Sequence, residues 1–350
     1  MPFELEKKII IAILLGLCLL FGGAVVFYFI ERNSARNNIK ESSVNKQVEP
    51  PALNSTDEEE KNLPVENDKT VKILFGGDIM LDRYIRTVIE LRSFDYIIED
   101  IKPLLNEADF VVANLEGSIT GNQSVSVGSG SDERNNFVFT FPKNVIPDLY
   151  KNNISVVNIG NNHILNFGHD GLEQTREALK KAGIKYFGDP ADPEYRRYIK
   201  KHNGIDIGFV CYNQFTEDGY QEALDDLSAI ENEADAVIVY AHWGTEYETR
   251  SNRTQREYAR TFIDKGADLI IGSHPHVVQE VETYKNKTIF YSLGNFIFDQ
   301  YFSEETQEGL LVQAIIRKKG EDFSIITNEI PIQLNNSGKT LRGYSQAGYY

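Results

Sequence analysis

Side chains that bind metal ions or move protons recur in this sequence directly behind short runs of apolar residues. These runs are rich in valine and isoleucine, and glycine usually stands nearby. The residues concerned are Asp78, Glu116, Asn162, His163, His242, His274 and His276. Any one of them alone is explained as a turn residue, a solvated carboxylate or a packed ring. Their repeated placement behind one kind of segment indicates a shared site.

The ligand types in this set indicate its chemistry. The carboxylates offer anionic oxygen, Asn162 offers neutral oxygen, the imidazoles offer nitrogen, and no cysteine takes part. Such a set suits Mn, Fe, Zn or Mg rather than a structural zinc site. It exceeds what one tetrahedral ion needs, so we expect one or two divalent ions, about 3.5–4 Å apart if there are two. His163 is then placed to protonate a leaving oxygen. His169 and His202 follow no such run, and we interpret them as structural.

The apolar runs themselves predict the elements that position these residues. Strands are expected at 72–75, 110–113, 154–159, 236–240, 268–271 and 288–291, with further strands at 309–316 and 323–330. Amphipathic stretches at 170–181 and 253–265 predict helices, and Gly183 follows the first of them. Strands that alternate with helices indicate an α/β fold. Ligands of such sheets bind beyond the carboxyl ends of the strands, so we expect the candidate residues to meet in one cleft.

The N-terminal fifth of the chain has a different organisation. Residues 9–30 are apolar and uncharged, which is long enough for one membrane-spanning helix, so we interpret residues 1–30 as a membrane anchor. A cleaved signal peptide, cut near Gly22 and Ala24, is the alternative. Residues 31–70 are polar and acidic and contain several prolines, which is typical of a flexible tether. The folded domain is expected at 71–335, followed by a polar tail at 336–350.

Composition excludes several classes of protein. The 350 residues carry a formal net charge of −16, which argues against a nucleic-acid binder, because phosphate contacts need clustered Lys and Arg. The two cysteines, Cys18 and Cys211, exclude a disulfide framework. Flanking Lys and Arg on both sides of the anchor leave its orientation undecided. An anchor ahead of one large domain most simply exports that domain, so we expect a single-pass protein of the cell membrane with an extracytoplasmic domain.

The candidate residues lie in motifs that resemble one family. The stretches are Gly77-Asp78-Ile79-Met80, Asn114-Leu115-Glu116, Asn161-Asn162-His163, His242-Trp243-Gly244-Thr245-Glu246-Tyr247, Gly272-Ser273-His274-Pro275-His276-Val277 and Tyr291-Ser292-Leu293-Gly294-Asn295-Phe296. In this order they are similar to the calcineurin-like metallophosphoesterases, and more specifically to the CapA/PgsA branch, the poly-γ-glutamate capsule biosynthesis proteins. The resemblance implies a four-layer αββα sandwich outside a prokaryotic membrane.

The resemblance also implies a role for each residue. Asp78 and His276 would hold one ion, and Asn162, His242 and His274 the other. Glu116 stands where the superfamily has a bridging aspartate, and His163 stands at the proton-donor position. Arg83, in the first motif loop, and Asn295 are the candidates for substrate binding. Met80 replaces the usual histidine of the first motif, and a thioether is a poor ligand for a hard cation.

Three interpretations of function follow. The first is a membrane-anchored capsule biosynthesis or export protein whose metal site acts on or holds an anionic polymer, poly-γ-glutamate, or a phosphorylated intermediate. The second is a non-catalytic, polymer-binding assembly subunit with a degenerate site. The third is a general extracytoplasmic metal-dependent phosphoesterase. For the first two, the resemblance implies membrane-embedded synthase subunits as partners.

Overall fold

The computed structural model describes residues 68–125, 137–320 and 322–343. All of them belong to one compact unit, Pro64–Tyr350. The predicted anchor, nearly all of the predicted tether and the end of the predicted tail lie outside the described residues. Within the described ranges, no helix is both long enough and apolar enough to cross a membrane.

The larger of the two main sheets has eight strands. Its order is β16 (Thr340–Arg342), β15 (Asp322–Leu334), β14 (Glu308–Lys319), β1 (Lys69–Ile79), β2 (Phe110–Leu115), β5 (Ile154–Asn158) and β6 (Lys185–Phe187), with β13 (Asn295–Ile297) beside the end of β1. Strands β1, β2, β5, β6 and β13 run parallel, while β14, β15 and β16 extend the sheet in antiparallel order. The parallel half therefore brings the ends of β1, β2 and β5 to one edge.

The smaller main sheet has six strands. Its order is β11 (Val281–Tyr284), β12 (Lys287–Phe290), β10 (Leu269–Ser273), β9 (Ala236–His242), β8 (Ile205–Asn213) and β7 (Arg197–His202). The four central strands are parallel and the two outer strands are antiparallel to their neighbours. A separate pair, β3 (Ser118–Thr120) and β4 (Thr140–Pro142), follows the larger sheet along the chain. The strands predicted from the apolar runs are confirmed, with differences of a few residues at their ends.

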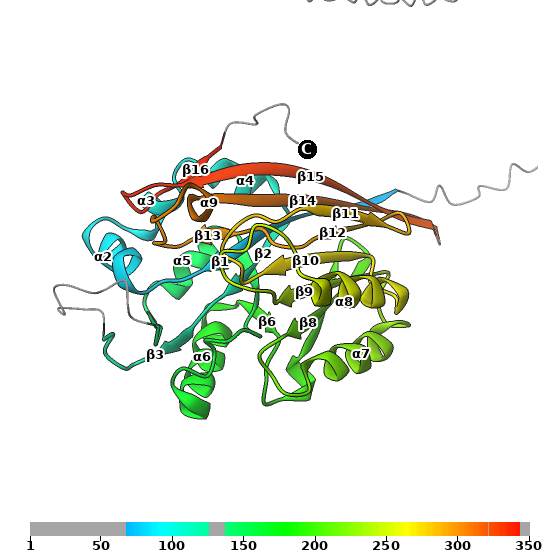
Figure 1. The fold of residues 1–350 in the computed structure, drawn as a ribbon, viewed down its shortest axis with the longest axis horizontal. Helices are drawn as coiled ribbons and strands as arrows, with labels where there is room; N and C mark the ends of the chain where they lie inside the picture. The colour runs from blue at the N-terminus through cyan, green and yellow to red at the C-terminus, as the bar shows by residue number, and fades with distance from the viewer. Residues whose placement is uncertain (1–67, 126–136, 321, 344–350) are drawn as a thin grey trace, which may run out of the picture. The chain divides into compact units, whose positions relative to one another are not determined.

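Helices cover the outer faces of both sheets (Figure 1). On the larger sheet these are α2 (Arg83–Leu91), α3 (Phe94–Ile98), α4 (Lys102–Glu107), α5 (Ile146–Lys151) and α6 (Gly168–Ala182). On the smaller sheet they are α7 (Gly219–Ile230) and α8 (Arg253–Asp264). Two short helical turns, η2 (Pro193–Tyr195) and α9 (Glu304–Gln307), complete the described elements.

Alternation along the strands produces the layers. In β9, Val237 and Val239 face the helices, whereas Ile238 and Tyr240 face the other sheet, because successive side chains of a strand point to opposite faces. A central core between the sheets thus lies between two outer cores under the helices. This is the αββα layering that the family resemblance implied.

Local sequence signals set the helix ends. Helix α8 begins with a capping box, in which Asn252 Oδ1 accepts from the Gln255 N–H at 2.9 Å and Gln255 Oε1 accepts from the Asn252 N–H at 2.9 Å. Helix α6 ends at Gly183, whose φ of +79° suits glycine. Both helices lie where the amphipathic pattern predicted them.

The two sheets are tied together near the ends of their parallel strands. Tyr240 Oη of β9 donates to the Gly76 carbonyl oxygen of β1 at 2.5 Å. At Gly77 the Gly294 carbonyl approaches so closely that a Cβ atom would lie 1.9 Å from its oxygen. Only glycine fits there, and this close approach brings the loop before β13 against the residue that follows, Asp78.

Candidate metal centre

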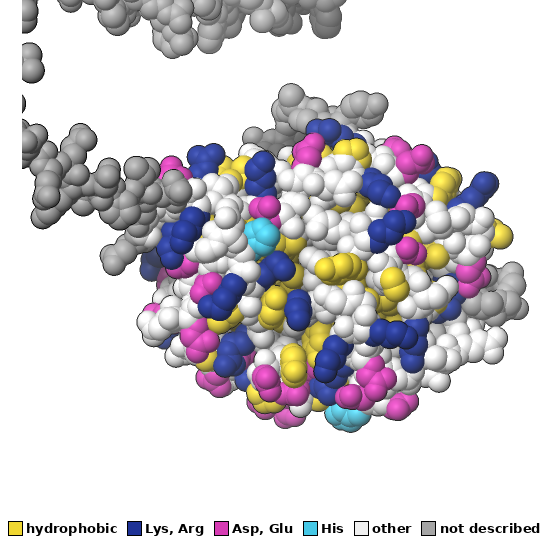
Figure 2. Space-filling model, turned by 180° about the vertical axis from the view of Figure 1, so that it is seen from behind, with side chains coloured by type: hydrophobic (Ala, Val, Ile, Leu, Met, Phe, Trp, Pro, Cys, Tyr) yellow, Lys and Arg dark blue, Asp and Glu magenta, His cyan; other side chains and the backbone are white. Residues whose placement is uncertain are grey.

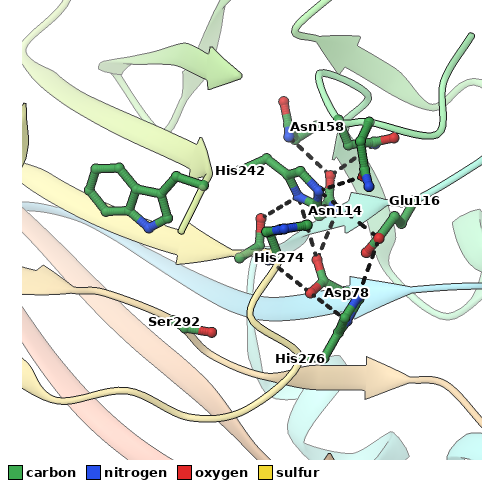
Figure 3. Close-up of polar contacts among 12 residues, drawn as sticks. Asp78, Asn114, Glu116, Asn158, His242, His274, His276 and Ser292 are labelled. Carbon is green, nitrogen blue, oxygen red and sulfur yellow. Dashed lines mark hydrogen bonds and ion pairs between the residues drawn. The ribbon is translucent and has the colours of Figure 1, made fainter. Parts of the chain in front are cut away.

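Side chains from both sheets meet where their parallel strands end (Figure 3). Asp78 is the second-last residue of β1, Glu116 directly follows β2, and His242 is the last residue of β9. His274 and His276 follow β10 in the loop that connects it to β11. All five side chains are buried. The expected convergence of strand-end residues is therefore present in the fold.

Glu116 occupies the middle of this group. Its Oε1 atom lies 3.5 Å from His276 Nε2, 3.8 Å from His163 Nε2 and 4.0 Å from His242 Nε2. The side chain is fully buried, yet neither carboxylate oxygen has a hydrogen-bond partner among the described residues. Burial, followed by the charge of Asp78, raises the pKa of Glu116 well above its usual range. A buried carboxylate without partners is costly, so these oxygens fit the role of ligands to a cation.

Asp78 is the second buried carboxylate. Its Oδ1 atom accepts from Asn114 Nδ2 at 2.8 Å, and its Oδ2 atom accepts from the His274 backbone N–H at 3.1 Å. His276 Nδ1 lies 3.4 Å from Oδ2. Burial alone would raise the pKa of Asp78, but the hydrogen bond and charge of His276, with the other donors, lower it below its usual value. Asp78 is thus held ionised next to the unpaired Glu116.

The two histidines behind β10 sit on strained backbone. Their backbone φ angles are +94° at His274 and +58° at His276, values that residues other than glycine rarely adopt. His274 Nδ1 is buried and has no hydrogen-bond partner among the described residues. Burial, then the neighbouring His276, lowers the pKa of His274 to about 3, so its ring is neutral and keeps a free nitrogen lone pair. The loop holds both rings against Glu116, with which they form one possible ligand group.

His242 reaches the same centre from the smaller sheet. Its Nε2 atom lies 2.9 Å from Asn162 Oδ1, and its Nδ1 atom lies 3.0 Å from Ser273 Oγ and 3.2 Å from Asn114 Nδ2. Burial, then the adjacent His274, lowers the pKa of His242 well below its usual value. With Asp78 and Glu116, this neutral ring forms a second possible ligand group. The contact between Asn162 Oδ1 and His242 Nε2 places Asn162 next to this ligand group.

A layer of carboxamides supports these side chains from behind. Asn114 Oδ1 accepts from Asn158 Nδ2 at 3.0 Å and from Asn161 Nδ2 at 3.2 Å, while its own Nδ2 donates to Asp78. Our sequence analysis did not assign Asn114, Asn158 or Ser273 to the site. The sequence did carry a signal, because Asn114 and Asn158 lie at or next to the last positions of strands that are otherwise apolar and buried. A polar residue at such a position must find buried partners.

His163 stands at the side of the centre with its orientation set by Asn166. The Asn166 Oδ1 atom accepts from the Phe139 N–H at 2.9 Å and lies 3.1 Å from His163 Nδ1, so Nδ1 carries the proton and donates to it. The ring also packs on Phe139, with 4.4 Å between centroids. Burial lowers the pKa of His163 to about 4. At neutral pH, Nε2 therefore faces Glu116 as an acceptor rather than as a proton donor.

Met80 does not face the centre as a ligand. Its side chain is fully buried in the outer core of the larger sheet, and its Sδ atom accepts from the Asp82 N–H at 3.1 Å. The departure at this position, noted in the sequence, thus removes one ligand from the Asp78 side of the centre.

The two candidates for substrate binding occupy different settings. Arg83 is buried and forms an ion pair with Asp299, between the rings of Phe139 and Phe298 at 5.2 and 5.3 Å, and its charge acts on Glu116. Asn295 is fully buried and lies behind His276, which makes it a support for a ligand rather than a group open to substrate.

The remaining described histidines lie apart from the centre. His202 is partly exposed on β7 and lies 3.5 Å from Asp109 Oδ1. His169 lies in the first turn of α6 and takes part in no ligand group found among the described residues. Neither histidine belongs to the candidate metal centre.

Comparison with known proteins places the whole site in one family. The family model described as "Bacterial capsule synthesis protein PGA_cap" matches residues 72–300. The chain is 30% identical over 271 residues to "PGA biosynthesis protein CapA" of Bacillus subtilis (strain 168), covering 73% of this chain and 70% of that protein. It is 26% identical over 289 residues to "Capsule biosynthesis protein CapA" of Bacillus anthracis, covering 77% and 68%. A "Probable polyglutamine synthesis accessory protein" of Mycobacterium tuberculosis is 26% identical over 293 residues, covering 67% of this chain and 76% of that protein. The chain belongs to the PGA_cap family of bacterial capsule synthesis proteins.

Proposed function

We propose that this chain takes part in making or exporting a capsule polymer, poly-γ-glutamate, through a centre that binds divalent metal. One observation carries the metal: Glu116 is buried with two unpaired oxygens among three imidazole nitrogens. The names of the Bacillus relatives support the polymer, since they are capsule or PGA biosynthesis proteins.

The donor set fits one or two cations. By the resemblance, Asp78 and His276 would hold one ion, Asn162, His242 and His274 would hold the other, and Glu116 would be shared. By distance, Glu116 groups with His274 and His276, and Asp78 and Glu116 group with His242. Oxygen and imidazole ligands without thiolate suit Mn, Fe, Zn or Mg. A cation there would supply Lewis acidity, which polarises a phosphoryl or carbonyl oxygen.

The chain's own groups define what else the site does. His163 Nε2, held as an acceptor by Asn166, would take a proton from a reacting hydroxyl or water and return it to a leaving group. The Arg83 charge, anchored by Asp299, would attract an anionic substrate toward the centre. Both roles suit a hydrolase of the metallophosphoesterase type.

An assembly role without catalysis is the second candidate, and Met80 is the observation that favours it. Its sulfur bonds to the Asp82 backbone, so the Asp78 ion would have fewer protein ligands than its neighbour. A centre with one firm ion would still hold carboxylates of a polymer without cleaving it.

The location proposed from the sequence completes the function. Residues 9–30 would anchor the chain in the membrane, and residues 31–70 would tether the domain outside it. The domain faces a polyanion although the chain has a net charge of −16. On the face in Figure 2, Lys and Arg side chains stand among acidic and hydrophobic ones, so repulsion there is not uniform.

Metal content tests the proposal. The full chain, expressed with Mn, Fe and Zn available, is expected to retain divalent metal by elemental analysis. His242→Ala and His274→Ala should each lower the content at least severalfold, because each removes a ligand. His202→Ala is the matched control, a histidine outside the centre, and should leave it unchanged. Equal content in all three variants would contradict the assignment.

Turnover separates the two candidate roles. The metal-loaded chain is offered γ-glutamyl oligomers and simple phosphoesters in parallel. Turnover of the oligomers that His163→Ala abolishes supports the enzyme. Metal binding without turnover of either substrate supports the assembly role. Turnover of phosphoesters alone would favour a general phosphoesterase.

A further inference from the structure

Tyr247 lies at the mouth of the metal centre in a constrained conformation. Its φ angle is +67°, and its backbone N–H donates to the Pro275 carbonyl at 2.8 Å, which ties it to the loop of His274 and His276. The centroid of its ring lies 6.2 Å from that of His276, and the residue is 42% exposed. A strained, half-exposed tyrosine fastened to a ligand loop has its side chain directed by the fold.

A chain of hydrogen bonds joins His276 to the Tyr247 hydroxyl. Asn295 Nδ2 donates to the His276 and Thr306 carbonyls at 3.3 and 3.0 Å and to Gln300 Oε1 at 3.1 Å. Because these partners are acceptors, Asn295 Oδ1 must be the atom that accepts from His276 Nδ1, at 3.0 Å. His276 Nδ1 is thereby the donor to Asn295, and Nε2 is the ring nitrogen that faces Glu116.

The same reasoning sets the Tyr247 proton. Since Gln300 Oε1 accepts from Asn295, Gln300 Nε2 is the donor that lies 3.2 Å from Tyr247 Oη. The tyrosine oxygen is an acceptor in this bond, so its own proton points away from Gln300. A tyrosine hydroxyl carries its proton at physiological pH, so Tyr247 Oη remains able to donate.

We propose that Tyr247 contacts the ligand of the metal centre, donating its hydroxyl proton to an anionic oxygen of a phosphate or a carboxylate. Glu246, which is exposed and directly precedes Tyr247, adds negative charge there that competes with an anionic ligand. Gln300 and Asn295 link the Tyr247 hydroxyl to the metal ligand His276. The hydroxyl and the imidazole therefore contact the same bound molecule. This inference rests on the proposed metal-binding function.

Exposed aromatic rings border the same opening. Phe302 is 62% exposed and packs edge-on against Tyr247, with 5.1 Å between centroids. Phe215 is 45% exposed and lies 4.5 Å from the ring of His274. Large apolar side chains left in water beside a polar centre are typical of a binding surface. They suit a ligand that carries methylene groups next to its anionic oxygens, as a γ-glutamyl chain does.

The test measures ligand affinity of the full chain loaded with Mn²⁺, by calorimetric titration with inorganic phosphate and, separately, with γ-linked triglutamate. Tyr247→Phe keeps the ring and removes only the donor, so affinity should fall about 10-fold. Gln300→Met should lower it by about threefold, because the hydroxyl remains but loses its orientation. Tyr195→Phe is the matched control, since Tyr195 is 40% exposed and stacks on Tyr186 away from the centre. Glu246→Gln should tighten binding.

The outcomes separate this inference from the metal proposal. Weaker binding of either probe by Tyr247→Phe, with metal content unchanged, supports the inference, and the probe affected identifies phosphate or carboxylate as the ligand. Wild-type affinity in Tyr247→Phe with metal bound overturns it alone. Lost metal in Tyr247→Phe also overturns it, because the residue then only supports the centre. Absence of metal from the wild-type chain would refute both proposals.

Discussion

Two fully buried carboxylates, Asp82 and Glu116, stand near the ends of neighbouring strands and meet opposite surroundings. Asp82 Oδ1 accepts from Arg86 Nε at 2.9 Å and from Ser124 Oγ at 2.6 Å, and its Oδ2 accepts from the Thr140 N–H at 3.0 Å. Glu116 has no such partner among the described residues. The difference teaches that burial alone does not identify a functional carboxylate.

The two carboxylates differ in whether partners inside the protein offset the free-energy cost of burying a charge. A buried charge that is paired and hydrogen-bonded stabilises the fold once it is there, and removing it leaves its partners unsatisfied. A buried charge without partners raises the free energy of the folded protein until a cation binds it. Asp82 therefore stabilises the fold, whereas Glu116 is available to bind a cation. The following predictions test this comparison, from the largest effect to the smallest.

Asp82→Asn should destabilise the metal-free chain by about 3 kcal/mol. The substitution keeps the shape of the side chain but leaves Arg86, which is 11% exposed, without its counter-charge. Urea unfolding followed by circular dichroism in EDTA measures the change. A loss below about 1 kcal/mol would show that the bonds around Asp82 are not those of a structural ion pair.

Added metal should stabilise the wild-type chain and not Glu116→Gln. A ligand at 100 times its dissociation constant adds about 2.7 kcal/mol to the free energy of unfolding, provided that it binds only the folded state. Asp82→Asn, although less stable, should show the same increment as wild type, since its site is intact. Thermal unfolding with and without Mn²⁺ measures the three increments. An equal increment in Glu116→Gln would remove that residue from the centre.

Without metal, Glu116→Gln should be as stable as wild type or more stable by about 1 kcal/mol, opposite in sign to Asp82→Asn. The amide is neutral, so it avoids the cost of burying an ionised carboxylate next to Asp78. The same urea titration in EDTA at neutral pH gives the value. A clear loss of stability would mean that Glu116 has a partner inside the folded chain.

Asp95 extends the comparison to the surface and should show the smallest effect. Lys102, then Asn152, lowers the pKa of Asp95 to about 2, against about 3.9 in an unfolded chain. Its stabilising contribution is therefore present above about pH 4 and lost as pH falls toward 2. Because the side chain is 37% exposed, screening keeps the contribution below about 1 kcal/mol. The stability gap between wild type and Asp95→Asn should narrow between about pH 4 and 2 and with added salt; a constant gap would contradict the assignment.

Much of this arrangement was predictable because its signals are local. The apolar runs that became β1, β2, β5, β9 and β10 are recognisable from β-branched residues, and α6 and α8 from their periodicity and their ends. Parallel order then placed the following residues at one edge, which is why Asp78, Glu116 and the three histidines near the centre were predicted together. Helix α7 was not predicted.

Roles that depend on distant partners were not predictable. Asn295 belongs to a motif, and the sequence suggested substrate binding, but the fold places it behind His276, 19 positions away. His163 was expected to donate a proton, whereas Asn166 and burial make its Nε2 an acceptor. Tyr247 follows a strand, where aromatic side chains commonly pack, and only the fold places Gln300 beside its hydroxyl.

By itself the sequence determined the α/β class, the edge at which ligands gather and the types of ligand atom available, because all three follow from periodicity and residue chemistry along short stretches. Only the tertiary structure decided which of those atoms are already satisfied. Asp82 finds Thr140, 58 positions away, and becomes structural, while Glu116 is enclosed by side chains that leave its oxygens unpaired. Hydrogen-bond satisfaction is a property of the folded surroundings, and no segment of the chain carries it alone.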